Sequence, residues 1–357
     1  MAPGPVTDSD PVTRNRQMLA RGLRWGLMAL SLGLLTRMAV SHYAEIRDAV
    51  SQLLTQSWWL VLGALVLETV WLFSLANVYR ASLRALGGRL TRGQAVRVSM
   101  GAFSLSRILP GGGAAGSVFA AREMIALGNP VPKTVASMLI SWWVSMTTLA
   151  LVVGVGTAIG IPDGQVGFAH LAGPGLVFGV LVVVGAAVLS ALGRPGVRAR
   201  LVSGLSRIGS RLGVSASSRD WEERVTTPVS VPRLIPLAGW AVLSWTADAA
   251  ALWLMFRGFG LTVHPAVLLV GYGLANLINA LPELTPGWLG VLESALAAAY
   301  AALGVPVGVA IVAVLCYRLV SYWLPVAVGV GPALSMLRGR PAPPTAQVSE
   351  RDLPVAV

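Results

Sequence analysis

The chain has 357 residues, of which 55% are hydrophobic and 12% are charged. This composition leaves too few polar side chains to cover a soluble globule, so we expect an integral membrane protein. Arg and Lys outnumber Asp and Glu by 27 to 15. Because there is one cysteine and the three histidines are scattered, the sequence argues against an intrachain disulfide, and we expect no bound metal and no cofactor.

Six apolar segments are long enough to cross about 30 Å of hydrocarbon, which takes about 20 helical residues. They lie near residues 20–41, 58–79, 133–159, 171–192, 234–256 and 306–335. Two further regions, 94–127 and 264–303, are interrupted in the middle by Pro-Gly runs. Each is predicted to be a re-entrant helical hairpin, and two short full spans are the alternative. The fold class is therefore an all-α polytopic membrane protein with about six spans and two hairpins.

The polar connections divide the chain into a few segments. A polar N-terminal segment, 1–17, precedes a first membrane half, 18–192. A basic linker, 193–233, separates it from the remainder of the second half, 234–336, and could be an interfacial helix or an ordinary cytoplasmic loop. Residues 337–357 are predicted to be a disordered tail.

Basic residues predict the orientation, because Arg and Lys near span ends are retained on the cytoplasmic side. Most of them precede the first span or lie between residues 80 and 133, in the linker and in the tail. The connections 42–57 and 160–170 instead contain more acidic than basic residues. Both termini are therefore predicted to be cytoplasmic, in a protein of the cytoplasmic membrane. The first hairpin then opens to the cytoplasmic face and the second to the external face.

A short pattern recurs in the two halves at a fixed spacing. Pro110-Gly111 is followed by LGNP at 127–130, and Pro286-Gly287 by LGVP at 303–306, with an offset of 176 throughout. Three spans and one hairpin in each half, with opposite topology, predict an inverted repeat. Substrate sites of such transporters form from broken helices near the middle of the membrane.

Glycine and proline at a hairpin tip suit a chain reversal, since Gly allows positive φ angles and Pro is tolerated at a helix start. We expect a half-helix to start at Pro286, with N–H groups that attract an anion such as a lipid phosphate. Glu293 would then lie about two turns into the half-helix. The alternative for Gly111, Gly112 and Gly116 is a small-residue surface that serves only helix packing.

Ionisable residues within apolar segments are the main candidates for function, because a charge in hydrocarbon costs several kcal/mol. Glu293 and Arg318 rank first, as a pair that could admit a headgroup, carry a proton or be purely structural. Arg107 and Arg122 could instead lie at the cytoplasmic interface. The remaining candidates are Glu68 and Asp248 in two spans, which could simply bond to neighbouring helices, Glu123 near the first hairpin and Glu283 near the second.

Three stretches of the second half resemble the lysylphosphatidylglycerol synthase transmembrane family, also called the flippase-like domain family. They are PGWLGVLE at 286–293, LGVP at 303–306 and CYRLVSYWLPVAVG at 316–329. PGGGAAG at 110–116, followed by ARE and LG, is similar to the first-half motif of that family. The resemblance covers roughly residues 20–335. It implies a polytopic membrane protein that, in the best-known members, moves a lipid such as lysylphosphatidylglycerol across the bilayer.

The resemblance also implies which residues take part in transport. They are Pro286, Gly287, Gly290, Glu293, Arg318, Tyr322 and Pro325 in the second half, and Gly111, Gly112 and Gly116 in the first. Two departures from the family pattern matter. The usual Pro-Gly-Gly reads Pro286-Gly287-Trp288 here, so a bulky ring replaces a glycine at the tip. Only a short tail follows the last predicted span, without the aminoacyl-transfer domain of full synthases, so lysylated lipid is not carried over as the substrate.

The sequence favours a translocator of a phospholipid or lipid-linked glycan, whose partners are membrane lipids with an anionic or phosphate-bearing headgroup. Two alternatives stay open: a proton-coupled transporter of a small solute, and a non-transporting scaffold for an envelope-synthesis enzyme. No nucleotide loop, aspartate-rich diphosphate motif or Ser/His/Asp set is present, so we expect no enzymatic activity and no nucleic-acid partner. A homodimer is compatible with the sequence but not required by it.

Overall fold

The structure, a computed structural model, describes residues 57–108, 112–167, 231–280 and 286–338, with isolated positions between 26 and 55 and at 179, 180 and 183. All regular elements within these described residues are helical. Several predicted segments lie wholly or largely outside them: the N-terminal segment 1–17, the spans 20–41 and 171–192, the linker 193–233 and the tail 337–357.

Four apolar helical stretches of 27 to 30 residues are long enough to cross a membrane. Two come from the first half, α3 (Trp58–Ala85) and α6 (Val131–Gly160). One from the second half is α10 (Val231–Gly258). The other runs from α13 (Val307–Arg318) through the π-helical turn η4 (Leu319–Trp323) to α14 (Leu324–Arg338). The prediction of an all-helical fold is confirmed for the described residues, and four of the six predicted spans correspond to apolar helices of membrane-spanning length.

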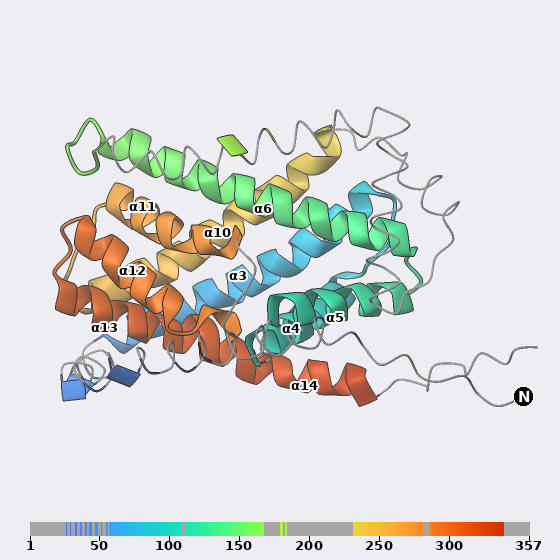
Figure 1. Cartoon of the computed structure of the whole chain (residues 1–357), viewed down its shortest axis with the longest axis horizontal. Coiled ribbons are helices and arrows are strands. Elements are labelled where there is room, and N and C mark those ends of the chain that lie inside the picture. The colour runs from blue at the N-terminus through green and yellow to red at the C-terminus, as the bar shows by residue number, and fades with distance from the viewer. Residues whose placement is uncertain are drawn as a thin grey trace, which may run out of the picture.

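Shorter helices lie where Pro-Gly runs break the sequence. The first pair is α4 (Arg92–Ile108) and α5 (Gly112–Ala126). The second is α11 (Pro265–Asn276) and α12 (Val291–Ala302), with the 3-10 turns η2 (Leu277–Ala280) and η3 (Pro286–Trp288) between them. Helices of this length rise only about 18–26 Å. In Figure 1 the α11–α12 pair lies beside one half of α6 and the α4–α5 pair lies towards the other end.

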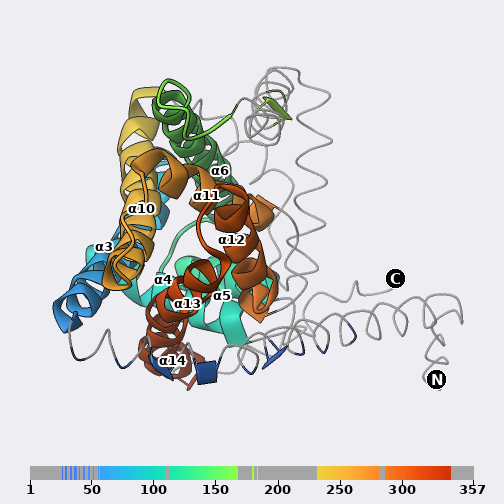
Figure 2. The ribbon, with the colours of Figure 1, turned by 90° about the vertical axis from the view of Figure 1, so that its left-hand side faces the viewer.

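The long helices surround these two pairs. Viewed from the end of the molecule, α3 and α10 lie side by side, with α6 above and α13–α14 below (Figure 2). α4 packs mainly against α14 and α5, whereas α11 packs mainly against α6 and α12. Small residues permit these approaches. A Cβ atom on Gly329 of α14 would lie 2.0 Å from Ser104 Oγ of α4, and one on Gly273 of α11 would lie 2.0 Å from Val153 Cγ2 of α6.

Helix boundaries in the two halves follow the spacing found in the sequence. α6 begins at Val131 and α13 begins at Val307, 176 positions later. A glycine in the left-handed region precedes each start, with φ of +87° at Gly128 and +86° at Gly304. A proline with extended backbone then caps each helix. α3 and α10 have the same length of 28 residues.

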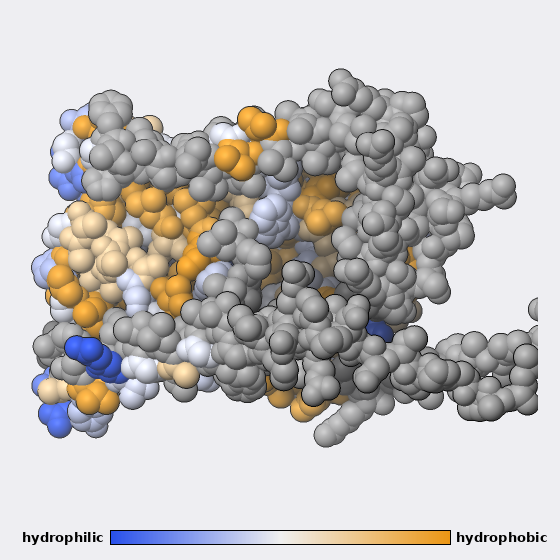
Figure 3. All heavy atoms as spheres, in the orientation of Figure 1, coloured by the Kyte–Doolittle hydropathy of each residue, from blue (hydrophilic) through white to orange (hydrophobic). Residues whose placement is uncertain are grey.

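The outer surface of the described helices is apolar. Trp58 and Trp59, at the start of α3, are 60% and 59% exposed, and Trp323 in η4 is 53% exposed. Hydrophobic residues cover the middle of the described surface in Figure 3, and hydrophilic residues gather at its left-hand end. A soluble monomer rarely exposes so much contiguous apolar surface. The surface therefore suits contact with lipid, with two of these tryptophans at the start of α3.

Candidate functional site

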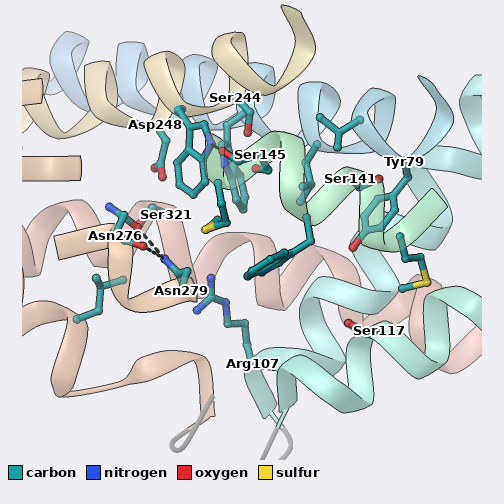
Figure 4. A pocket seen from close by; sticks show the side chains of 18 of the residues that line it. Tyr79, Arg107, Ser117, Ser141, Ser145, Ser244, Asp248, Asn276, Asn279 and Ser321 are labelled. Atoms are coloured by element: carbon teal, nitrogen blue, oxygen red, sulfur yellow. Dashed lines mark hydrogen bonds between the residues drawn. The ribbon is translucent and has the colours of Figure 1, made fainter. Parts of the chain in front are cut away.

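A cavity of ≈ 470 Å³ lies between the two halves of the chain. Side chains of α3, α4, α5 and α6 form its walls from the first half, and those of α10 to α13 with η2 and η4 form them from the second. Figure 4 shows polar groups gathered at one end; they are Arg107, Asp248, Asn276, Asn279 and Ser321, and Arg318 also lines the cavity. Apolar residues of α3, α5 and α6, such as Leu75, Val118 and Leu139, line much of the remainder.

Glu293 and Arg318 form the buried ion pair that the sequence predicted. Arg318 Nε donates a hydrogen bond of 2.6 Å to Glu293 Oε1, and the two residues are 6% and 1% exposed. The other carboxylate oxygen, Oε2, accepts a bond of 2.7 Å from the backbone N–H of Gly290. Both oxygens of Glu293 are thus occupied, which leaves the carboxylate fixed in place.

The turn before α12 differs from our expectation. Gly287, Trp288 and Gly290 have φ angles of +56°, +57° and +80°, which a right-handed helix cannot contain. The half-helix therefore begins at Val291 rather than at Pro286, and Glu293 is its third residue. The prediction that Glu293 lies two turns inside the helix was wrong. Its carboxylate takes the position at the helix N-terminus where we expected a bound anion.

The tips of the two short helix pairs meet at Gly287. Arg107 Nη1, at the end of α4, donates a bond of 2.8 Å to the Gly287 carbonyl, and Arg318 Nη2 donates one of 3.2 Å to the same oxygen. The carbonyl thus bridges arginines from opposite halves of the chain. Arg107 is half-buried and bonded to the second half of the chain, which favours a place in the site over the alternative of an interfacial side chain.

Tyr322, which lies in η4, contacts both arginines. The guanidinium carbons of Arg107 and Arg318 lie 5.4 Å and 4.7 Å from the centre of its ring, within the range of cation–π attraction. The Tyr322 hydroxyl also donates a bond of 2.9 Å to the carbonyl of Arg107. The π-helical turn ends shortly before Pro325, which cannot donate an N–H and whose ring crowds the preceding turn. This local irregularity places Ser321 at the cavity wall, with Tyr322 behind it.

A second polar cluster lies where α3 and α10 pack together. Asp248 of α10 accepts bonds of 2.5 Å from the hydroxyls of Tyr272 in α11 and Tyr317 in α13, one at each oxygen. Glu68 of α3 is 1% exposed and interacts with Asp248. The two acidic residues predicted in separate spans are therefore brought together.

Other predicted residues lie away from the cavity wall. Arg122 is exposed and Glu123 half-buried on α5, although Ser117 and Ala121 of the same helix line the cavity. A Cβ atom on Gly116 would lie 2.4 Å from the Ala102 carbonyl oxygen, so this glycine serves the packing of α5 on α4. Gly112 is the first residue of α5. The described residues do not include Gly111 and Glu283.

Sequence reasoning missed Asn276, Asn279, Tyr317 and Ser321, which line the cavity without carrying a charge. For two of these residues, Asn276 and Asn279, the sequence contained a pattern that could have identified them. Tyr272, Asn276 and Asn279 are spaced by four and three residues, so they share one face of an otherwise apolar helix. Tyr317 has no such pattern, because its hydroxyl meets Asp248 across 69 positions of sequence.

Comparison with known proteins identifies the family of the chain. A family described as the lysylphosphatidylglycerol synthase TM region matches residues 23–329. Two matches are to proteins named UPF0104 membrane protein from Methanothermobacter thermautotrophicus, each 33% identical, over 89 and 88 residues. Each of these matches covers 25% of this chain and 26% of the relative. Because the family match extends over most of its length, the chain belongs to the lysylphosphatidylglycerol synthase TM-region family.

Proposed function

We propose that this protein moves a lipid with an anionic or phosphate-bearing headgroup across the cytoplasmic membrane. The observation that carries the proposal is the cavity between the two halves, whose polar end presents Arg107 and Arg318 and whose remaining walls include many apolar side chains. Guanidinium groups form strong, directional hydrogen bonds to phosphate oxygens. A cavity of this volume falls in the range of small-ligand sites, which suits a headgroup whose acyl chains stay in the bilayer.

The amides of Asn276 and Asn279 add donors and acceptors next to the arginines. Such groups can bind the glycerol or sugar hydroxyls of a headgroup. This combination favours a phospholipid or lipid-linked glycan over a purely apolar substrate.

Transport would use an inverted repeat with two re-entrant hairpins. The recurrence of helix starts at an offset of 176 supports the repeat. The matching contacts, α4 on α14 and α11 on α6, support it further. The short helices rise less than the thickness of the hydrocarbon, which favours re-entry from opposite faces. In this scheme one half rocks against the other around the cavity, as in other repeat transporters. The protein would act as a transporter rather than as an enzyme.

Reconstitution into lipid vesicles tests the proposal. A phospholipid with a fluorescent acyl chain and an anionic headgroup is followed by its accessibility to a membrane-impermeant reductant. We expect the wild-type protein to expose inner-leaflet lipid, Arg107→Gln to slow this several-fold, and Arg257→Gln to leave it unchanged. Arg257 is a matched control because it is exposed and stacks on Trp253, away from the cavity lining. Protein-containing vesicles that behave like empty ones would contradict lipid transport.

Mass spectrometry of lipids that co-purify in native-membrane particles provides an independent measurement. Selective enrichment of one anionic lipid class, reduced in Arg107→Gln, would name the substrate. Lipids that match the bulk membrane in both proteins would count against a headgroup site in the cavity.

A further inference from the structure

Two acidic side chains meet inside the described helix bundle without a cation between them. Glu68 and Asp248 are 1% and 7% exposed and interact directly. Arg318, the cation that also acts on Glu68, donates its Nε–H to Glu293 instead. Burial of two carboxylates side by side would cost several kcal/mol for each charge and would add their mutual repulsion.

The two carboxyl groups differ in their hydrogen bonds. Each oxygen of Asp248 accepts a tyrosine hydroxyl, from Tyr272 and from Tyr317. Neither oxygen of Glu68 has a donor among the residues that the structure describes. An ionised carboxyl group can only accept hydrogen bonds, so two of them in contact are satisfied only when one carries a proton. Because both oxygens of Asp248 already accept a hydrogen bond and neither oxygen of Glu68 does, we place the proton of the pair on Glu68.

Within the described part of the chain, three titratable or charged groups from the surrounding helices act on this pair. They are Tyr272 of α11 and Tyr317 and Arg318 of α13. Arg318 is paired with Glu293 of α12, and Arg107 of α4 lines the same cavity as Asp248. Asp248 also lines the cavity, whereas Glu68 lies behind it. A proton that enters from the cavity would thus reach Asp248 first and Glu68 next.

We propose that Glu68 and Asp248 form a proton-binding site beside the cavity. One proton from the cavity forms an O–H bond at a carboxyl oxygen of the pair, and its release returns the proton to the cavity. Gain or loss of this charge changes the electrostatic potential next to Arg318. On the basis of the proposed function, proton binding would then be coupled to headgroup binding. In the Glu293–Arg318 pair, the other candidate for carrying a proton, both oxygens of Glu293 already accept hydrogen bonds, so we assign the proton to Glu68 and Asp248 instead.

Infrared difference spectroscopy of the full chain in lipid nanodiscs tests the site without any transport. At neutral pH, the wild-type protein should show a protonated carboxyl band that shifts in D₂O and disappears on alkalinisation. Glu68→Gln should remove this band. Asp163→Asn, which changes an exposed carboxyl in the turn after α6, should keep it. A wild-type protein without the band, or Glu68→Gln with the band at full intensity, would overturn the proposal.

A second variant tests the pairing independently, in case Glu68→Gln does not fold. Asp248→Asn leaves Glu68 facing an amide, and the band should then shift in frequency because the carboxyl partner is lost. An unshifted band would overturn the pairing. In vesicles, a pH gradient should change the rate of lipid movement several-fold in wild type and not in Glu68→Gln. Lipid movement indifferent to the gradient would overturn the coupling alone, whereas a titrating band without lipid movement would overturn the proposed function alone.

Discussion

Arg107 and Arg318, which are 211 positions apart in the sequence, donate hydrogen bonds to the same carbonyl oxygen. That oxygen belongs to Gly287, in the turn before α12. The two positive charges thereby lie against one backbone group and one aromatic ring, that of Tyr322. The Gly287 carbonyl thus connects an arginine of the first half with an arginine of the second. If the proposed function holds, a headgroup that binds Arg107 would act on both halves through this connection.

Loss of Glu293 should destabilise the protein. Glu293→Gln leaves the buried Arg318 without its carboxylate, and breaking a buried ion pair costs about 3–5 kcal/mol. We expect a lower midpoint of thermal unfolding in nanodiscs and loss of lipid movement. The double variant Glu293→Gln with Arg318→Met should recover much of the stability, because no unpaired charge remains, but not the transport. Equal stability of wild type and Glu293→Gln would show that the pair contributes little.

Replacement of Arg107 should weaken headgroup binding more than it weakens the fold. A charge-assisted hydrogen bond contributes about 1.5–3 kcal/mol, so Arg107→Gln should lower the affinity for a phosphate-bearing lipid at least about tenfold. Titration of short-chain anionic lipid into nanodiscs measures this. Arg257→Gln should retain wild-type affinity. An equal loss in both variants would indicate general surface charge instead of a site.

A side chain at Gly287 should disturb the arginine pair. Its φ of +56° costs an L-residue about 1–2 kcal/mol, and a Cβ atom would lie 2.4 Å from Arg107 Cδ and 2.5 Å from Tyr322 Cε2. Gly287→Ala should therefore lower both stability and transport. Gly304→Ala is the control, since its φ is +86° and no atom lies within 4 Å of the added carbon. It should share the backbone strain and keep the transport rate of the folded protein.

Substitution of Gly329 tests the close contact between α4 and α14. A Cβ atom there would lie 2.0 Å from Ser104 Oγ and 2.6 Å from the Met100 carbonyl oxygen. Gly329→Ala should cost about 1–3 kcal/mol, as overpacking does in other cores. Gly331→Ala, two residues further along the same helix and in open space, should stabilise by up to about 1 kcal/mol. Unfolding in denaturant compares the two, and a similar effect at both positions would contradict close helix packing.

Trp288 is the residue in the turn before α12 at which the resemblance to the family led us to expect a glycine. Its φ of +57° is unfavourable, yet the side chain is only 4% exposed and belongs to the main hydrophobic core. Trp288→Gly should relieve about 1–2 kcal/mol of strain and lose about 3–5 kcal/mol of burial. We expect a net loss of stability, measured by the unfolding midpoint. A higher midpoint would mean that burial of the Trp288 ring stabilises the protein by less than the strained backbone destabilises it.

Local patterns explain which parts of the structure were predictable. Hydropathy over about 20 residues identified α3, α6, α10 and the α13–α14 run, because a membrane helix must satisfy its backbone within one apolar segment. Pro-Gly runs marked the breaks between the short helices. Opposite charges at Glu293 and Arg318 suggested the ion pair. The start of α12 was misplaced, because the positive φ angles of Gly287, Trp288 and Gly290 arise in a turn that packs against Arg107 and Tyr322.

The sequence alone therefore determined the class of protein, the positions of four spans and the family, since composition, hydrophobic length and short motifs are local properties. Only the tertiary structure decided which polar groups meet. It placed Arg107 against Gly287, and Glu68 against Asp248 with its two tyrosines. Such contacts join residues from different helices, and their formation depends on how small residues let the helices approach. For this reason the cavity and the carboxyl pair follow from packing and not from any single stretch of sequence.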